Sequence, residues 1–270
     1  MINLDVHDAD ALANAVAGHS ALVNLVAVLH GTPALFEWVH VALPGKIARA
    51  CALARVRQVV HISALAADAR RPGAAPSMYL RSKSRGEAVL LQAAQADAAG
   101  GRDGFDLSIL RPSVIFGAQD KFLNLFAKLQ KRLPVMPLAC ADARFQPVWV
   151  DDVASAVVAC LSGACAVASP RIIEAYGPEV FTLKQLVQLA ARLSGVADGK
   201  ARPVLSLPDW AARLQASLMG LVPGEPMMSL DNLDSMKVDN VATGHYPGLD
   251  ALGIKTAALQ PVAHDYLAGR

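Results

Sequence analysis

Short runs of β-branched and apolar residues alternate along this chain with longer stretches of helical periodicity, and this alternation constrains the fold more than any other feature. The runs predict strands at residues 22–28, 58–63, 107–110, 147–150 and 171–176. The periodic stretches predict helices at residues 9–16, 36–54 with room for a break at Pro44, 77–96, 122–131, 152–161, 183–193 and 209–221. Such alternation is typical of a parallel sheet with helices on both faces, so we predict an α/β fold.

The composition narrows the class of protein. Hydrophobic residues make up 54% of the 270 residues and charged residues 18%, which excludes a disordered chain. The longest apolar runs, such as residues 153–161, are too short to span a bilayer. The net charge is only +2 and the basic residues are scattered, which argues against a nucleic-acid partner. The four cysteines include no C-x-x-C pair, which indicates reduced thiols and no metal site. We therefore expect a soluble, cytoplasmic protein.

The chain changes character in its last third. Proline and glycine become denser after Ser169 and the rhythm of strands weakens. We therefore expect a main domain at residues 1–165 and a smaller substrate or interaction region at residues 166–270. Within that region the predicted helix at 209–221 has one apolar face, which consists of Trp210, Leu214, Leu218 and Leu221. We expect this face to pack into the core; the alternatives are a partner subunit and a membrane surface.

The strongest local motif is Tyr79-Leu80-Arg81-Ser82-Lys83, which begins a predicted helix one loop after the predicted strand that ends at Ser63. A spacing of four places Tyr79 and Lys83 on one helix face. The ammonium of Lys83 would lower the pKa of Tyr79 and hydrogen-bond a nicotinamide ribose, while Ser63 would polarise a carbonyl. A Y-x-x-x-K pair arises by chance in roughly one such chain in eight, but its position after a strand strengthens it. We predict Ser63, Tyr79 and Lys83 as catalytic residues.

Taken together, these residues resemble the extended and atypical short-chain dehydrogenase/reductase families. The branch that they are most similar to is the NAD(P)H-binding accessory subunit of respiratory complex I. The matching stretches are residues 5–8 (DVHD), 23–26 (VNLV), 60–65 (VHISAL), 79–83 (YLRSK) and 111–117 (RPSVIFG). Narrower signatures of that branch are residues 120–124 (DKFLN), 144–148 (RFQPV) and 231–236 (DNLDSM). The resemblance implies a Rossmann-like sheet that binds NAD or NADP.

The same resemblance implies which residues contact the dinucleotide. They are Asp5 and Val6 beside the adenine, Leu25, Val26 and Ala27 on the adenosine side, Tyr79 and Lys83 at the nicotinamide ribose, and Pro112, Ser113, Val114 and Ile115 near the nicotinamide. A purely structural role is also open at two positions here. Asn24 could satisfy a backbone group at a strand end, and Pro112 could end a strand.

One part of the dinucleotide fold is missing from the sequence. The fold opens with a strand, a G-x-x-G-x-x-G loop and a helix whose N-terminus receives the diphosphate, and no such pattern occurs here. Gly100, Gly101 and Gly104 follow a predicted helix, which is typical of a turn. We therefore expect a sheet without its first two strands, a chain that begins at the third strand near residues 2–4, and roughly 50 further residues upstream, the size of a βαβ unit.

Two functions follow from this sequence. The first is an NAD(P)H-binding accessory or assembly protein of the respiratory NADH:quinone oxidoreductase, with a mainly structural nucleotide. It would contact complex I subunits and associate at most peripherally with the inner face of the cytoplasmic membrane. The second is a soluble NAD(P)H-dependent reductase or epimerase that uses Ser63, Tyr79 and Lys83. A nucleotide sensor without chemistry is a third, weaker hypothesis. Without the phosphate loop we expect weakened dinucleotide binding, and NAD and NADP cannot be told apart.

Overall fold

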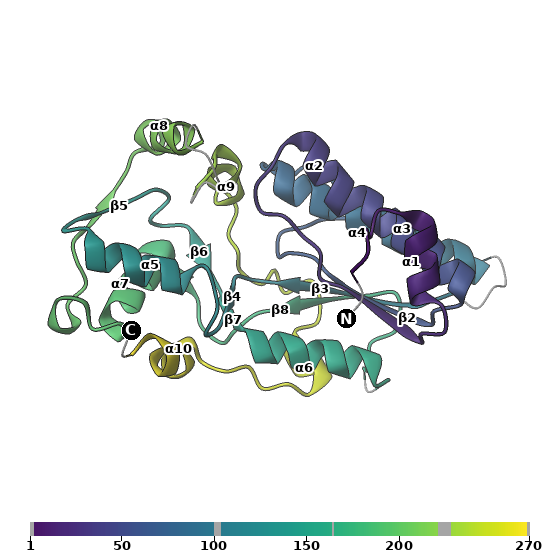
Figure 1. Cartoon of the computed structure of the whole chain (residues 1–270). Coiled ribbons are helices and arrows are strands. Elements are labelled where there is room, and N and C mark those ends of the chain that lie inside the picture. Colours follow the sequence, from purple (N-terminus) through teal and green to yellow (C-terminus); the bar gives the residue numbers. More distant parts are fainter. Residues whose placement is uncertain (1–2, 100–103, 164, 221–227, 269–270) are drawn as a thin grey trace.

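Four parallel strands form the central sheet of the chain (Figure 1). The computed structural model describes residues 3–99, 104–163, 165–220 and 228–268. Within these residues the sheet has the order β1-β2-β3-β8, with β1 at Ala21–Asn24, β2 at Gln58–Ile62, β3 at Asp106–Pro112 and β8 at Arg171–Ala175. Every neighbouring pair is parallel. All carboxyl ends of these strands therefore lie at one edge of the sheet.

Helices cover both faces of this sheet. On one face lie α1 (Ala9–Val16), α3 (Leu43–Ala54) and α4 (Met78–Ala99), and on the other lies α6 (Val150–Leu161) (Figure 1). Successive side chains of a strand point to opposite faces, so Val59 packs with α1, α3 and α4 while Val60 packs with α6. The predicted α/β fold with a parallel sheet is confirmed.

The first strand of the sheet is shorter than predicted. The strand expected at residues 22–28 ends at Asn24, and residues 25–28 continue outside any strand. Asn3 and Leu4, where the sequence predicts another strand, are also not in one, and residues 1–2 lie outside the described part. An extended segment needs a neighbouring strand for its backbone N–H and C=O groups. Among the described residues nothing pairs with the outer side of β1, so β1 is an edge strand of this sheet.

The helix predicted at residues 36–54 is three helical segments without a break at Pro44. A short helix α2 (Pro33–Glu37) continues into a π-helix η1 (Trp38–Ala42), and α3 follows directly. The N–H of Leu43 donates to the Trp38 carbonyl five residues earlier. Pro44 lies in the first turn of α3 and has no N–H to donate to a carbonyl of the preceding π-helix. The wider turn of the π-helix thus accommodates this proline.

A second core lies beside the sheet. It is formed by α5 (Leu123–Arg132), α7 (Leu183–Leu193) and α10 (Leu259–Leu267). Short strand pairs accompany it: β4 (Ile115–Phe116) with β7 (Val148–Trp149), β5 (Met136–Leu138) with β10 (Val204–Ser206), and β6 (Arg144–Phe145) with β9 (Phe181–Thr182). The strand predicted at 147–150 is thus β7, outside the central sheet. Since β8 pairs with β3, the central sheet extends past the boundary expected near residue 165.

The apolar face predicted to enter the core is exposed instead. On α8 (Asp209–Met219), Trp210 is 71% exposed, Leu214 55% and Leu218 56%, while Leu221 lies outside the described residues. The buried side of α8 consists of Ala212 and Ala216, which pack with α9 (Leu230–Ser235). Small residues permit that close approach, so the larger side chains face outward. The single-turn helices η2 (Val196–Gly199) and η3 (Leu249–Leu252) complete the chain. Among the described helices, none is both long and apolar enough to cross a bilayer.

Candidate functional site

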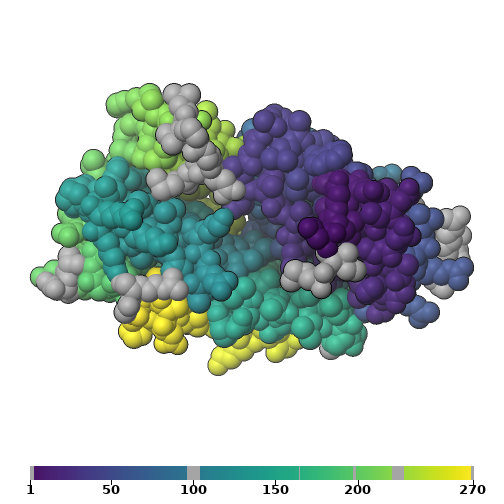
Figure 2. Space-filling model, in the orientation of Figure 1, coloured from purple at the N-terminus to yellow at the C-terminus, as the bar shows by residue number. Residues whose placement is uncertain are grey.

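The carboxyl ends of three neighbouring strands bring most of the predicted site residues to one edge of the sheet. Residues 25–27 follow β1, Ser63 follows β2, and residues 112–115 end and follow β3. In open parallel sheets this edge is where ligands bind. Figure 2 shows the surface hollowed between the purple N-terminal part and the teal part of the chain.

Lys83 is buried directly below this edge. Its Nζ donates to the Ile62 carbonyl at 2.6 Å, at the last residue of β2 and next to Ser63. Burial lowers the pKa of Lys83 to about 8, partly opposed by the carboxylate of Glu87. The buried Ser63 Oγ has no hydrogen-bond partner within the described chain. A buried hydroxyl beside a buried ammonium fits a polar ligand group, because unpaired buried polar atoms are otherwise costly.

Tyr79 lies half-buried on the first turn of α4, with its ring packed edge-on against two aromatic rings. The ring centroids are 5.6 Å from His40 and 6.4 Å from Phe36. Burial raises the pKa of Tyr79 to about 12. The predicted lowering by Lys83 is therefore wrong, because burial disfavours the charged phenolate and so raises the pKa of Tyr79. At neutral pH Tyr79 keeps its proton and can donate a hydrogen bond.

His40, which no sequence pattern indicated, links the segment after β1 to the first turn of α4 through hydrogen bonds. The N–H of Val28 donates to His40 Nε2 at 3.1 Å, so Nδ1 carries the proton and donates to Ser82 Oγ at 2.8 Å. Ser82 Oγ in turn donates to the Tyr79 carbonyl at 2.8 Å. Burial and the Lys83 charge lower the pKa of His40 to about 3, so it is neutral. His40 lies in the π-helix, a local feature that often marks functional sites.

A second buried histidine, His61 on β2, pairs with Asn24 on β1. Asn24 Nδ2 and His61 Nδ1 are 3.0 Å apart, and Asn24 Oδ1 accepts from the Val26 N–H at 3.1 Å. Asn24 thus does satisfy a backbone group at a strand end, which is the structural role considered for it above. His61 Nε2 has no partner among the described residues. Burial, with the charge of Lys83, lowers the pKa of His61 well below its usual value.

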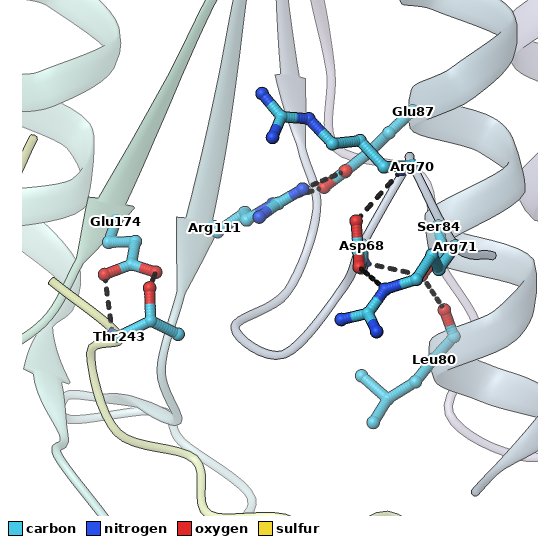
Figure 3. A network of polar contacts seen from close by, with 9 residues as sticks. All are labelled: Asp68, Arg70, Arg71, Leu80, Ser84, Glu87, Arg111, Glu174 and Thr243. Atoms are coloured by element: carbon cyan, nitrogen blue, oxygen red, sulfur yellow. Dashed lines mark hydrogen bonds and ion pairs between the residues drawn. The ribbon is translucent and has the colours of Figure 1, made fainter. Parts of the chain in front are cut away.

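A buried ion pair lies between α4 and β3 (Figure 3). Arg111 donates to the Glu87 carboxylate through Nε at 2.9 Å and Nη2 at 2.6 Å, and both side chains are almost fully buried. The guanidinium also lies 4.7 Å from the centre of the Tyr246 ring. On the loop before α4, the Asp68 N–H donates to Ser84 Oγ at 2.9 Å. These contacts hold α4 against the sheet. They therefore also hold Lys83, which lies on α4, in place beside the last residue of β2.

The C-terminal segment contacts the same edge of the sheet. Ser113 Oγ donates to Asn240 Oδ1 at 2.6 Å. Glu174, near the end of β8, accepts from Thr243 Oγ1 at 2.6 Å, a contact that Figure 3 shows. Pro112 is the last residue of β3, so it does end a strand. The Ser113 hydroxyl is engaged within the protein, which leaves Val114 and Ile115 as the more accessible positions of this group.

The predicted adenine-side residues lie near the start of the chain. Asp5 is exposed, Val6 is half-buried, and the Asp5 carboxylate accepts from the His7 N–H at 2.8 Å. The His7 ring stacks on Trp38 of the π-helix at 4.2 Å, a contact that no sequence pattern indicated. Leu25, Val26 and Ala27 are exposed after β1 and available to a ligand.

Neither a metal centre nor a phosphate loop is apparent in the part of the chain that the structure describes. No group of three or more His, Cys, Asp or Glu residues there could hold a metal ion. Gly100 and Gly101 lie outside the described residues, and Gly104 lies just before the first residue of β3, Asp106. The predicted dinucleotide contacts that lie in the described part of the chain are therefore those assigned to the adenosine, the nicotinamide ribose and the nicotinamide.

Comparison with known proteins identifies one matching family and several similar proteins. Residues 1–163 match the 3-beta hydroxysteroid dehydrogenase/isomerase family. The chain is 30% identical over 260 residues, 95% of its length, to "NADH dehydrogenase [ubiquinone] 1 alpha subcomplex subunit 9, mitochondrial" of Mus musculus, and spans 63% of that protein. It is 24% identical to "NADH-ubiquinone oxidoreductase 40 kDa subunit, mitochondrial" of Neurospora crassa, covering 99% of this chain and 65% of the relative. The chain thus spans less than two thirds of either relative.

Among solved structures, the chain resembles an NADPH-dependent quinone oxidoreductase from Escherichia coli, determined as a complex with NADPH. The TM-score is 0.70 at 18% sequence identity, and the match covers 97% of this chain and 82% of the other. At this identity the likeness establishes the fold alone. The Rossmann-like architecture expected from the sequence is confirmed.

Proposed function

Because the chain belongs to the 3-beta hydroxysteroid dehydrogenase/isomerase family, we propose that it uses the dinucleotide fold of this family as an accessory or assembly protein of a respiratory NADH:quinone oxidoreductase. The observation that carries the proposal is the alignment, over nearly the whole chain, with relatives that are named as subunits of that complex. The bound nucleotide has a mainly structural role. Fold alone would not distinguish this function from others.

The arrangement of side chains supports nucleotide binding more than catalysis. Leu25, Val26 and Ala27 would contact the adenosine, with Asp5 and Val6 beside the adenine. Tyr79 and Lys83 would hold the nicotinamide ribose, and residues 112–115 would lie near the nicotinamide. A phenol with a pKa of about 12 is a poor proton donor in a reaction at neutral pH, yet it remains a good hydrogen-bond donor to a ribose hydroxyl. The nucleotide, when bound, would supply a rigid bridge between these groups.

We expect this 270-residue chain to bind NADPH and NADH only weakly, because no glycine-rich loop in its sequence can receive the diphosphate. Isothermal titration calorimetry with each nucleotide measures this directly. Dissociation constants well above the micromolar range are expected. Micromolar affinity would contradict the proposal that the missing phosphate contacts limit binding.

The exposed face of α8 is the surface that we assign to the partner complex. Trp210, Leu214 and Leu218 form a contiguous apolar stripe, of the kind that marks protein or membrane contacts. Such contact would hold the protein peripherally at the inner face of the cytoplasmic membrane. The affinity-tagged protein should co-purify with oxidoreductase subunits from gently solubilised membranes, and Leu214→Ser should reduce the yield several-fold. Val158→Ser, at an equally exposed position on α6, is the control. Recovery without any such subunit would contradict the assignment.

A reductase or epimerase is the second candidate. The observation in its favour is the unpartnered hydroxyl of Ser63, adjacent to the carbonyl that receives Lys83. In this function the nicotinamide would transfer a hydride to a carbonyl carbon while Tyr79 donates a proton to its oxygen. A panel of carbonyl substrates with NADPH tests it, with the wild-type chain and with Tyr79→Phe. Turnover that the Phe variant abolishes would favour the enzyme over the accessory protein.

A further inference from the structure

Asp231 reaches from the C-terminal region to the first turn of α4. Its carboxylate accepts from the Met78 N–H at 2.6 Å and from the Tyr79 N–H at 3.0 Å, although the two segments are more than 150 residues apart in sequence. The side chain is buried, and it lies on α9, which packs against α4.

The contact completes the hydrogen bonding of the start of α4. The first N–H groups of a helix have no partners within the helix. Ser77 Oγ accepts from the Leu80 N–H at 3.2 Å, and Asp231 accepts from the two preceding N–H groups. A negative charge at this position also interacts favourably with the helix dipole. The backbone of Tyr79 is therefore fixed by a residue from outside its own segment.

Asp231 and Asp234 occupy the same short helix but serve different contacts. Asp231 faces α4, whereas Asp234 pairs with Arg213 of α8 at 2.8 Å and with Lys237 at 2.7 Å. The two residues thus provide a matched pair of carboxylates, of which only Asp231 touches the helix that carries Tyr79.

We propose that Asp231 is a positioning residue of the nucleotide site, which holds Tyr79 at the nicotinamide ribose from the C-terminal region. This inference rests on the proposed function, because it assigns Tyr79 to the nicotinamide ribose. The C-terminal region is then part of the site rather than an appendage to it. Asp231 does not itself touch the nucleotide; it acts through the backbone of Tyr79.

The test separates the two halves of the nucleotide. Reduced nicotinamide mononucleotide probes the Tyr79 side, and adenosine 2′,5′-bisphosphate probes the adenine side, each titrated by NMR into wild type, Asp231→Asn and Asp234→Asn. We expect Asp231→Asn to weaken binding of the nicotinamide fragment about fivefold or more, because the amide keeps one neutral acceptor oxygen but loses the charge and the second hydrogen bond. It should leave the adenine fragment within about twofold, and Asp234→Asn should change neither. Equal weakening of both fragments by Asp231→Asn, or equal effects of the two variants, overturns the proposal.

Amide hydrogen exchange tests, independently of nucleotide binding, whether Asp231 fixes the first turn of α4. Asp231→Asn should accelerate exchange at Met78 and Tyr79 about tenfold while the β2 amides of Val59 and Val60 remain protected. Unchanged exchange at Met78 and Tyr79 overturns the proposal, as does uniform acceleration in β2. If wild type binds neither fragment, the proposed nucleotide function fails, and the exchange result still shows whether Asp231 fixes this turn.

Discussion

Two neutral histidines are buried on the inner side of the site, and each makes the stability of the protein depend on pH. The pKa of His40 is lowered to about 3 and that of His61 well below its usual value of 6.5, in both cases chiefly by burial. Between about pH 6.5 and the folded-state pKa, the unfolded chain binds more protons than the folded one. The free energy of unfolding therefore falls as the pH falls through this window, and it gains nothing further from these groups above about pH 6.5.

The expected decline approaches about 1.4 kcal/mol per pH unit for each histidine at the steepest part. Urea unfolding at pH 7.5 and pH 5.5 measures it. His40→Gln should show a shallower decline than wild type, because one titrating group is gone, while His19→Gln, at an exposed position, should match wild type. Identical midpoints of the wild type at the two pH values would refute this account.

The Glu87–Arg111 pair gives a second prediction at this scale. Its side chains are 0% and 4% exposed, so Glu87→Gln leaves a buried guanidinium without its counter-charge. We expect a loss of about 3–5 kcal/mol in the free energy of unfolding. The exposed Glu37–Arg85 pair has the same 2.6 Å separation but is 53% and 46% exposed, so Glu37→Gln should cost about 0–1 kcal/mol. Similar losses in both variants, measured by chemical denaturation, would show that burial is not the decisive factor.

Among the helices, the contact between α4 and the π-helix depends on one glycine. A Cβ at Gly86 would lie 2.0 Å from the His40 carbonyl oxygen, a backbone atom that cannot turn away. Gly86→Ala should therefore destabilise the protein by about 1–3 kcal/mol or more, as other overpacking changes do.

Gly45 in α3 is the matched control. A Cβ there would meet only Val89 at 3.7 Å, an ordinary contact. Gly45→Ala should be neutral or stabilise by up to about 1 kcal/mol, because alanine is the better helix former. Thermal unfolding of both variants makes the comparison, and an equal response would disprove the steric argument.

The elements that the sequence predicted best are those whose pattern reflects the sheet itself. β2, β3 and β8 were found because both of their faces are buried, so that each carries adjacent apolar residues: Val59 and Val60, Ile109 and Leu110, and Ile172 and Ile173. β1 was predicted too long, since Leu25 and Val26 continue the apolar run but lie beyond the last paired residue. The exposed stripe on α8 was assigned to the core, because a helical period does not reveal whether a partner is present.

The difference between local motifs and long-range contacts also explains which residues of the candidate site could be predicted from the sequence. Ser63, Tyr79 and Lys83 were predicted from a short local motif and from its position after a predicted strand, and both are visible in the sequence. His40 and Asp231 act across 42 and more than 150 residues, through contacts that only the folded chain creates. The pKa of Tyr79 was predicted in the wrong direction because the sequence shows the nearby lysine but not the burial.

For the molecule as a whole, we expect the outer edge of β1 to determine how strongly the chains associate with one another in solution. Nothing in the described chain pairs with this edge, and Leu29 close after it is 59% exposed. An unpaired strand edge beside apolar side chains favours association between chains. Sedimentation velocity should show association that grows with concentration. Leu29→Lys should weaken it, and Leu53→Lys, at a position 68% exposed on α3, should not. A monomer at all concentrations would contradict this expectation.

The link from Met78 to Asp231 sets the order in which a newly made chain can mature. The two residues are 153 positions apart, so at roughly 5–20 residues per second the ribosome adds Asp231 about 8–30 seconds after Met78. All four strands of the sheet have been synthesised before that moment. Each molecule therefore passes through an interval during its synthesis in which the sheet can assemble while the first turn of α4 still waits for its carboxylate.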